Sequence, residues 1–239
     1  MMELFQLAYV CRIYGGLTLF DAGYHTFLDK TGGKLNFEEP SHMKALLVWL
    51  NSWGCRQFAI DYHDLAIESI RGWAKRWESR LPDRVTTLDR LPDKGIEEAG
   101  NAYADISKCL ASRRNRDGSL YDVQVGPTGA AKILFAARPR AFPPWDDPIR
   151  ARFEFDGSRH SYCDYLVRVR EQIRQLCSKA AKFGIPPDNI PLEIGRPRST
   201  LPKLIDEYNW VTVTKRFLPP EPSDIAKWHT WSGQYPDAQ

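Results

Sequence analysis

Apolar residues recur at helical spacing along most of the chain, and this pattern predicts a mainly helical protein. In HMKALLVWLNSW, for example, Met43, Leu46, Leu47 and Leu50 fall on one face. The expected helices are this segment, with Ser41 as its N-cap, then 60–78, 96–112, 129–137, one from about Pro148, 161–182 and LPKLIDEYNW. The fold class expected is therefore all-α.

The remaining segments are predicted to be irregular. LPDRVTTLDRLPDK and IPPDNIPLEIGRPRS contain prolines at intervals that favour connectors, and RRNRDGS carries a D-G turn signal in a basic loop. The β-branched run VTVT (211–214) is the only segment predicted as a strand. The last twenty residues are expected to form an extended tail.

Length and composition narrow the class of protein. A chain of 239 residues, 43% hydrophobic and 26% charged, suits one globular domain or two packed lobes. No apolar run reaches 18 residues, which argues against a membrane partner. The start lacks the features of a secretory signal, and the scattered cysteines favour the cytosol, so we expect a cytoplasmic protein. We also expect it to be a monomer. The net charge of +3 neither requires nor excludes a nucleic acid.

Cysteine and histidine spacing gives no sign of a metal site. The five cysteines form no CxxC pair, and the five histidines form no HExxH motif. We therefore expect no metal, no cofactor and no disulfide framework. Aromatic residues make up 12% of the chain; they usually fill cores, but they also suit a protein that stacks bases.

The most informative stretch is residues 125–150, which begins with VGPTGAAKIL. Gly126 and Gly129 favour a tight turn that opens a helix, whose free amides can hold a phosphate. Taken alone, the turn is explained more simply by an ordinary connection between helices. Further on, Asp147 before Pro148 fits an N-cap, which leaves Asp146 to face a cleft and stabilise a sugar cation.

VGPTGAAKILFAARPRAFPPWDDPIR resembles the core signature of the helix-hairpin-helix DNA glycosylases. The signature combines a glycine hairpin, a short apolar helix, a Gly/Pro loop and a catalytic aspartate. Gly126 and Asp146 are 146 − 126 = 20 residues apart, the usual interval in the family, and Phe142-Pro143 precedes the aspartate as it often does there. The resemblance covers about a tenth of the chain.

The resemblance implies roles for individual residues. Asp146 would be the catalytic carboxylate, and the hairpin would bind DNA through Val125, Gly126, Thr128, Gly129 and Ala130. Thr128 occupies the position of the Schiff-base lysine of bifunctional members, so a monofunctional enzyme that uses water is implied. Lys132 would contact a phosphate or remain a solvated charge. The four-cysteine iron–sulfur signature of many relatives is absent.

The resemblance also implies an architecture of two helical lobes flanking a DNA-binding cleft, with a helix-hairpin-helix motif at about 110–140. Residues 41–140 would form the internal lobe, which ends in that motif. Residues 1–40 plus 141–239 would form the second lobe, including the C-terminal tail.

Other residues are candidates for gripping DNA or lining the base pocket. Arg113, Arg114 and Arg116 form either a phosphate grip or a solvated loop, and Lys132, Arg138, Arg140, Arg150 and Arg152 would extend the basic neighbourhood. A wedge or pocket role is open for Asn51, Trp53 and Arg56, although a helix C-cap at Gly54 explains that segment more simply. The same applies to Tyr62 and His63, which begin a helix, and to Trp145, which either walls the pocket or fills the lobe interface.

The sequence therefore favours a DNA N-glycosylase that flips a base out of double-stranded DNA and hydrolyses its glycosidic bond. The alternative is a non-catalytic helix-hairpin-helix DNA-binding protein. A carbohydrate-active enzyme using Asp146 and Asp147 ranks last, because adjacent carboxylates cannot readily flank one glycosidic bond. The biological context, repair or antiviral defence against modified phage bases such as glucosylated hydroxymethylcytosine, stays open.

Overall fold

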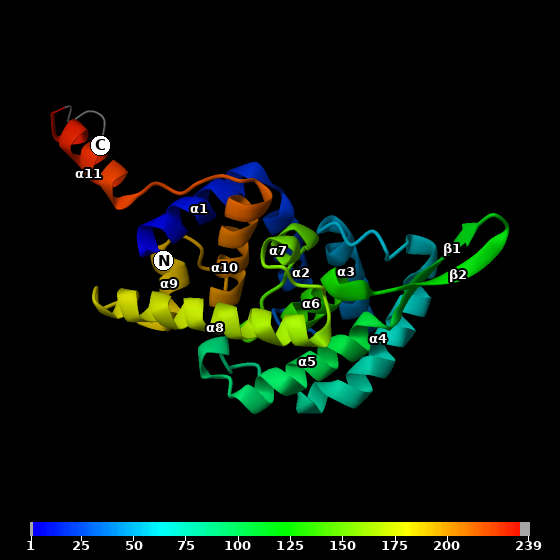
Figure 1. The fold of residues 1–239 in the computed structure, drawn as a ribbon. Coiled ribbons are helices and arrows are strands. Elements are labelled where there is room, and N and C mark those ends of the chain that lie inside the picture. Colours follow the sequence, from blue (N-terminus) through cyan, green and yellow to red (C-terminus); the bar gives the residue numbers. More distant parts are fainter. Residues whose placement is uncertain (1, 235–239) are drawn as a thin grey trace.

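The computed structural model describes residues 2–234 and is predominantly helical, as expected (Figure 1). Its longer helices are α1 (Leu4–Leu17), α2 (Phe20–Thr31), α3 (Pro40–Ser52), α4 (His63–Trp77), α5 (Asp93–Ser107), α6 (Gly126–Ala137), α8 (Arg159–Ala181), α10 (Leu201–Asn209) and α11 (Pro222–Gln234). The shorter ones are η1 (Ile60–Tyr62), η2 (Glu78–Arg80), η3 (Leu88–Arg90), α7 (Asp147–Arg152), η4 (Pro187–Asn189), α9 (Ile190–Glu193) and the π-helix η5 (Trp210–Thr214). None of the described helices has the length and apolar character needed to cross a membrane.

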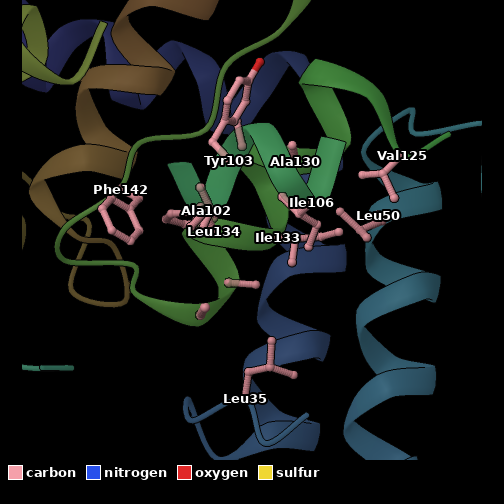
Figure 2. Packing of buried hydrophobic residues seen from close by; sticks show 14 of the residues in the cluster. Leu35, Leu50, Ala102, Tyr103, Ile106, Val125, Ala130, Ile133, Leu134 and Phe142 are labelled. Atoms are coloured by element: carbon pink, nitrogen blue, oxygen red, sulfur yellow. The ribbon is translucent and has the colours of Figure 1, made fainter. Parts of the chain in front are cut away.

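Helix α6 lies at the centre of the main hydrophobic core. Every residue from Gly129 to Ala137 is buried, because GAAKILFAA combines small residues with apolar ones. In Figure 2, Ile133 and Leu134 of α6 lie among side chains from several other elements, including Leu50 of α3 and Ile106 of α5. Such central packing holds both ends of α6 firmly in place.

The long helix α8 packs along α5 and also contacts α10, while α1 packs on α10 (Figure 1). Helix α2 packs closely on α3, so contacts cross the lobe boundary expected near residue 40. The buried cluster that includes Tyr24 continues through α3–α6 to Ile205 of α10. The division into two lobes stays a prediction.

A β-hairpin stands where the sequence predicted the end of a helix and a basic loop. Strands β1 (Leu110–Arg116) and β2 (Ser119–Gln124) pair antiparallel between α5 and α6 and project from the helical body (Figure 1). Asp117 and Gly118 both have positive φ, as a two-residue hairpin turn requires. The prediction of a helix over 96–112 was therefore wrong beyond Ser107.

The prediction of a strand at VTVT was wrong as well. Residues 210–214 form η5, which continues α10, and Val211 packs beside Val10 and Tyr14. The β-branched residues had no neighbouring strand to pair with, and burial against α1 outweighed their intrinsic preference.

Two further local predictions are corrected. The N-cap of α3 is Glu39, which accepts a hydrogen bond from the Ser41 N–H, and Pro40 takes the first helical position. The expected C-terminal tail contains α11, which begins at Pro222; residues 235–239 of that tail lie outside the described residues.

Candidate functional site

A pocket of about 360 Å³ contains Asp146 and is lined from α1, α2, α6, α7, α10, η5 and the segment after α3. Its residues come from both of the lobes that the sequence predicted, for example Lys132 from one and Asp206 from the other. The volume is at the lower end of the roughly 300–1,000 Å³ typical of small-ligand sites. A single nucleobase suits such a pocket better than an extended ligand.

Asp146, not Asp147, is the N-cap of α7. The Asp146 Oδ1 accepts a hydrogen bond from the Ile149 N–H at 3.1 Å, and Pro148 stands in the first turn. The sequence assigned the cap to Asp147 because that residue directly precedes the proline; the helix begins one residue earlier. The cap fixes the Asp146 carboxylate at the pocket, where its second oxygen remains available.

Opposing effects act on the pKa of the half-buried Asp146 carboxyl group. Burial raises its pKa above the ordinary value, while the hydrogen bond from Ile149 and the charge of Lys132 act to lower it. A carboxylate that is incompletely solvated interacts strongly with a positive charge that develops beside it. This suits stabilisation of a sugar cation.

Aromatic rings wall the pocket. Tyr14, Phe20, Trp53 and Trp210 line it together with Trp145. Trp53 donates its indole N–H to the Phe20 carbonyl at 2.8 Å, which fixes one wall. Trp145 is fully buried against Tyr165 and donates to the Pro127 carbonyl at 3.3 Å, so it both backs the pocket and fills the core. Flat apolar walls of this kind suit a planar base.

Lys132 is buried at the pocket, with 7% of its surface exposed, so the expectation of a solvated charge was wrong. Its Nζ donates to the Trp53 carbonyl at 2.6 Å and lies 5.5 Å from the centre of the Trp53 ring. That hydrogen bond uses one of the three N–H donors of the Lys132 ammonium. The ammonium therefore supplies positive charge at the wall of the pocket.

Thr128 and Asp147 join the start of α6 to α7. The Thr128 hydroxyl donates to Asp147 Oδ1 at 2.9 Å and accepts from Arg150 at 2.9 Å, and Arg150 also pairs with Asp147. Thr128 lines the pocket, but its hydroxyl is occupied in this arrangement. These contacts keep Asp146 and the first turn of α6 in fixed relative positions.

The turn before α6 is built as its glycines predict. Gly126 has a φ of 67°, and no side chain caps the amides of the first turn of α6. Val125 and Ala130 are buried, and the Val125 N–H already donates to the Cys109 carbonyl, so neither residue is placed to contact a ligand directly. Gln57 closes the turn by donating to the Val125 carbonyl at 2.7 Å. Uncapped amides at a helix N-terminus are suited to an anion.

A Gly129→Ala substitution is expected to destabilise the protein by about 1–3 kcal/mol. A Cβ at Gly129 would lie 2.7 Å from Gln57 Nε2 and 2.9 Å from a Val125 methyl carbon, so the turn must shift. Gly16→Ala is the matched control: it lies in α1 with no atom within 4 Å of its Cβ, and we expect it to be neutral or slightly stabilising. Chemical denaturation of both variants checks this; equal stabilities would contradict it.

The three arginines of the basic run lie on strand β1, not in a loop. All three are exposed; Arg113 pairs with Asp122 across the hairpin at 3.0 Å, and Arg116 lies 3.7 Å from Asp117. Arg114 makes no ion pair with the described residues and stands opposite Tyr121 in the register. The hairpin thus carries Arg114 away from the helical body.

The other cations of the expected basic neighbourhood are mostly used within the fold. Arg138 is buried and donates to the carbonyls of Pro82, Glu78 and Ala137. Arg140 pairs with Asp188, and Arg150 with Asp147, while Arg152 is exposed. The continuous basic surface expected from the sequence is therefore reduced to the hairpin and isolated positions.

Four of the wedge or base-pocket candidates lie outside the pocket, and one of them, Asn51, has a structural explanation. Asn51 donates to the Phe58 carbonyl at 2.8 Å, which closes the turn after α3. The C-cap of α3 is Trp53, one residue before the expected Gly54, whose φ of 81° turns the chain away from the helix. Arg56 is exposed. Tyr62 and His63 are half-buried at the start of α4 and do not line the pocket.

Sequence reasoning missed several pocket residues: Tyr14, Phe20, Gln57, Asp206 and Trp210. Asp206 stands out among them because it is buried and acidic. Its segment, LPKLIDEYNW, was recognised as a helix, but its charged residues look like an ordinary solvated face. Only the tertiary structure brings them inside.

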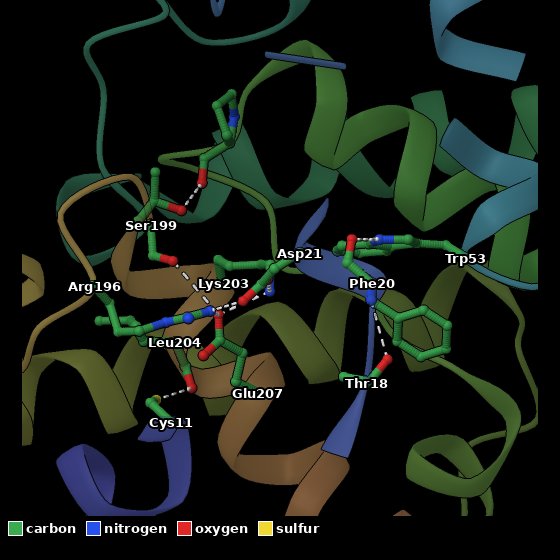
Figure 3. A network of polar contacts seen from close by, with 12 residues as sticks. Cys11, Thr18, Phe20, Asp21, Trp53, Arg196, Ser199, Lys203, Leu204 and Glu207 are labelled. Carbon is green, nitrogen blue, oxygen red and sulfur yellow. Dashed lines mark hydrogen bonds and ion pairs between the residues drawn. The ribbon is translucent and has the colours of Figure 1, made fainter. Parts of the chain in front are cut away.

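A buried ion network fixes α10 beside the pocket (Figure 3). Lys203 Nζ lies 2.8 Å from Glu207 Oε1 and 3.3 Å from Asp21 Oδ1, and Arg196 pairs with both carboxylates. Lys203 also lies over the Tyr14 and Trp53 rings. The network joins α2 to α10 and thereby positions two pocket walls.

A larger depression of about 580 Å³ lies elsewhere, beside α8 and η4. Its charged side chains are already paired, Arg140 with Asp188 and Asp89 with Arg90. Its volume alone would favour this depression as the ligand site, but each charged residue in its lining is already in an ion pair. The Asp146 pocket is therefore the better candidate site.

Comparisons of the chain with protein-family models, curated proteins and solved structures find no match.

Proposed function

We propose that this protein is a monofunctional DNA glycosylase that acts as a monomer on double-stranded DNA. The observation that carries the proposal is the position of Asp146. Its carboxylate caps α7 and lies at a pocket that has aromatic walls and the size of a nucleobase. The family resemblance of residues 125–150 supports the same assignment for Asp146. A flipped base would stack within the aromatic walls, with its sugar at the mouth of the pocket.

The chemistry assigned to Asp146 is electrostatic and positional. As the C1′–N bond lengthens, positive charge develops on the sugar, and the adjacent carboxylate stabilises it. The free carboxylate oxygen also orients a water toward C1′. Thr128 offers no amine for a Schiff base and its hydroxyl is held by Asp147 and Arg150, which supports hydrolysis by water rather than a lyase step.

DNA binding is assigned to the turn before α6 and to the β-hairpin. The amides at the first turn of α6 would hold a phosphate close to the pocket. The seven residues of β1 extend roughly 20 Å, so the arginines can contact backbone several nucleotides away from the flipped base.

The double variant Arg114→Ala/Arg116→Ala is expected to weaken duplex binding and to reduce the slope of log K against log salt by about 2, one for each lost phosphate contact. Arg113→Ala is the comparison, and its effect should be smaller because Asp122 already offsets that charge. Fluorescence anisotropy over a salt series measures both. An unchanged slope in the double variant would remove the hairpin from the DNA interface.

Incubation with duplexes carrying different bases tests the function directly. The set comprises uracil, hypoxanthine, 7-methylguanine, 8-oxoguanine, 5-hydroxymethylcytosine and its glucosylated form, so that repair and antiviral substrates are both represented. We expect alkali-labile abasic sites from at least one duplex. Tight binding without abasic sites on every duplex would favour the non-catalytic DNA-binding alternative.

A further inference from the structure

Asp206 is a second carboxyl group in the same pocket, and the fold gives it no partner. It lies on α10, is 8% exposed and lines the pocket with Asp146. Its side chain makes no hydrogen bond or ion pair to any residue within 2–234. Its oxygens stay accessible from the pocket and are not taken up by the fold, so they can bind a ligand there.

The surroundings of Asp206 favour its neutral form. Burial raises the pKa of Asp206 to about 8; the charge of Lys203 opposes this shift and that of Asp146 adds to it. Lys203 is paired with Glu207 and Asp21, and Lys132 donates to the Trp53 carbonyl and acts on Asp206 through its charge, without an ion pair to it. The groups that face Asp206 are Lys203 and Glu207 on its own helix, Tyr14 on α1, Lys132 on α6, Asp146 on α7 and Tyr165 on α8.

The two carboxyl groups therefore differ in environment. Asp146 caps a helix and receives an N–H, which stabilises its charged form, whereas the Asp206 carboxyl receives no hydrogen bond from the part of the chain that the structure describes. When the environments of two neighbouring acids push their pKa values apart, one can serve as the charged group and the other as the proton donor. Departure of an uncharged nucleobase is eased by a proton, because the base otherwise leaves as an anion.

Building on the proposed glycosylase function, we propose that Asp206 is a second catalytic residue, the general acid that protonates the departing base. Asp206 gives its proton to a ring nitrogen or carbonyl oxygen of the base while the C1′–N bond breaks and its electron pair passes to the base. Water adds its oxygen to C1′ and gives a proton to Asp146. The products are a neutral base and an abasic sugar; solvent then takes the proton from Asp146 and returns one to Asp206.

The test is the pH dependence of single-turnover base release from the duplex that the wild-type protein cleaves best. The wild-type rate should fall as pH rises through about 8, because Asp206 then loses its proton. Asp206→Asn should lower the rate at neutral pH at least about 100-fold and remove this alkaline fall. Asp164→Asn, an exposed position on α8, is the control and should keep the wild-type profile.

A second measurement does not depend on activity. Because folding raises the pKa of Asp206, the stability that it contributes is complete at low pH and is lost as pH rises toward 8. The Tm of the wild type should therefore fall relative to that of Asp206→Asn between pH 5 and 8. Should Asp206→Asn fail to fold, Lys132→Met serves instead: loss of a charge that opposes the shift should move the alkaline fall to higher pH.

The outcomes separate the two proposals. An Asp206→Asn protein with the wild-type rate and pH profile, beside an inactive Asp146→Asn protein, would overturn the role of Asp206 and leave the glycosylase function intact. Absence of base release from all of the duplexes by the wild-type protein would overturn both.

Discussion

Asp146→Asn should lower base release by at least about 1,000-fold while the affinity for duplex DNA changes less than about threefold; loss of one preorganised charge beside the reacting centre typically costs a factor of 100–1,000 or more. Asparagine is isosteric and is itself a good N-cap, so α7 should keep its start and the protein its stability. Single-turnover kinetics and fluorescence anisotropy on the same duplex measure the two effects separately.

Asp147→Asn is the matched control for this experiment. Asp147 adjoins Asp146 in sequence, but its side chain is 79% exposed and it pairs with Arg150 and Thr128. Its charge is screened by solvent, so we expect a loss of less than tenfold. Equal losses in the two variants would mean that general electrostatics, and not the position of Asp146, governs the rate.

Lys203→Met should destabilise the protein by about 3–5 kcal/mol, because it leaves the buried Glu207 and the half-buried Asp21 with only Arg196 to balance them. Burial by itself lowers the pKa of the Lys203 ammonium, but the carboxylates of Glu207 and Asp21 outweigh burial and raise it, so the lysine stays charged. Chemical denaturation measures the loss, which corresponds to a fall in Tm of about 10 °C or more.

Two comparison variants define the cause of that loss. Lys203→Met/Glu207→Met should recover much of it, because an apolar pair of similar volume avoids an unpaired buried charge. Asp29→Asn removes one partner of the exposed pair with Arg198 and should cost less than about 1 kcal/mol. A Lys203→Met protein as stable as Asp29→Asn would show that the buried network does not hold α10 in place.

The helical character of the chain could be predicted from periodicity, because long amphipathic segments such as α5 and α8 carry a strong pattern. The hairpin β1–β2 was missed, although the D-G pair at Asp117-Gly118 is a strong signal for a two-residue turn. Beyond Ser112 its strands are almost entirely exposed, so they lack the alternation of apolar and polar residues that marks a half-buried strand.

The candidate site was predictable in part. Asp146 and the glycine turn were found from local sequence, since both lie in one stretch with characteristic spacing. Asp206 could not be found in this way. Helix α10 is buried from Pro202 to Glu207, and its charged side chains are neutralised by Asp21 and Arg196. Asp21 is far from α10 in the sequence, so the local pattern gives no sign of this pairing. Periodicity cannot distinguish such a helix from one with a solvated face.

The most direct measurement of the central claim is mass-spectrometric detection of free base after incubation of the duplex set with wild-type protein and with Asp146→Asn in parallel. The account predicts that the wild type releases an intact base from at least one duplex, leaving an uncleaved strand with an abasic site, and that Asp146→Asn releases none over the same time. Release of the base by both proteins at similar rates, or by neither, would contradict it.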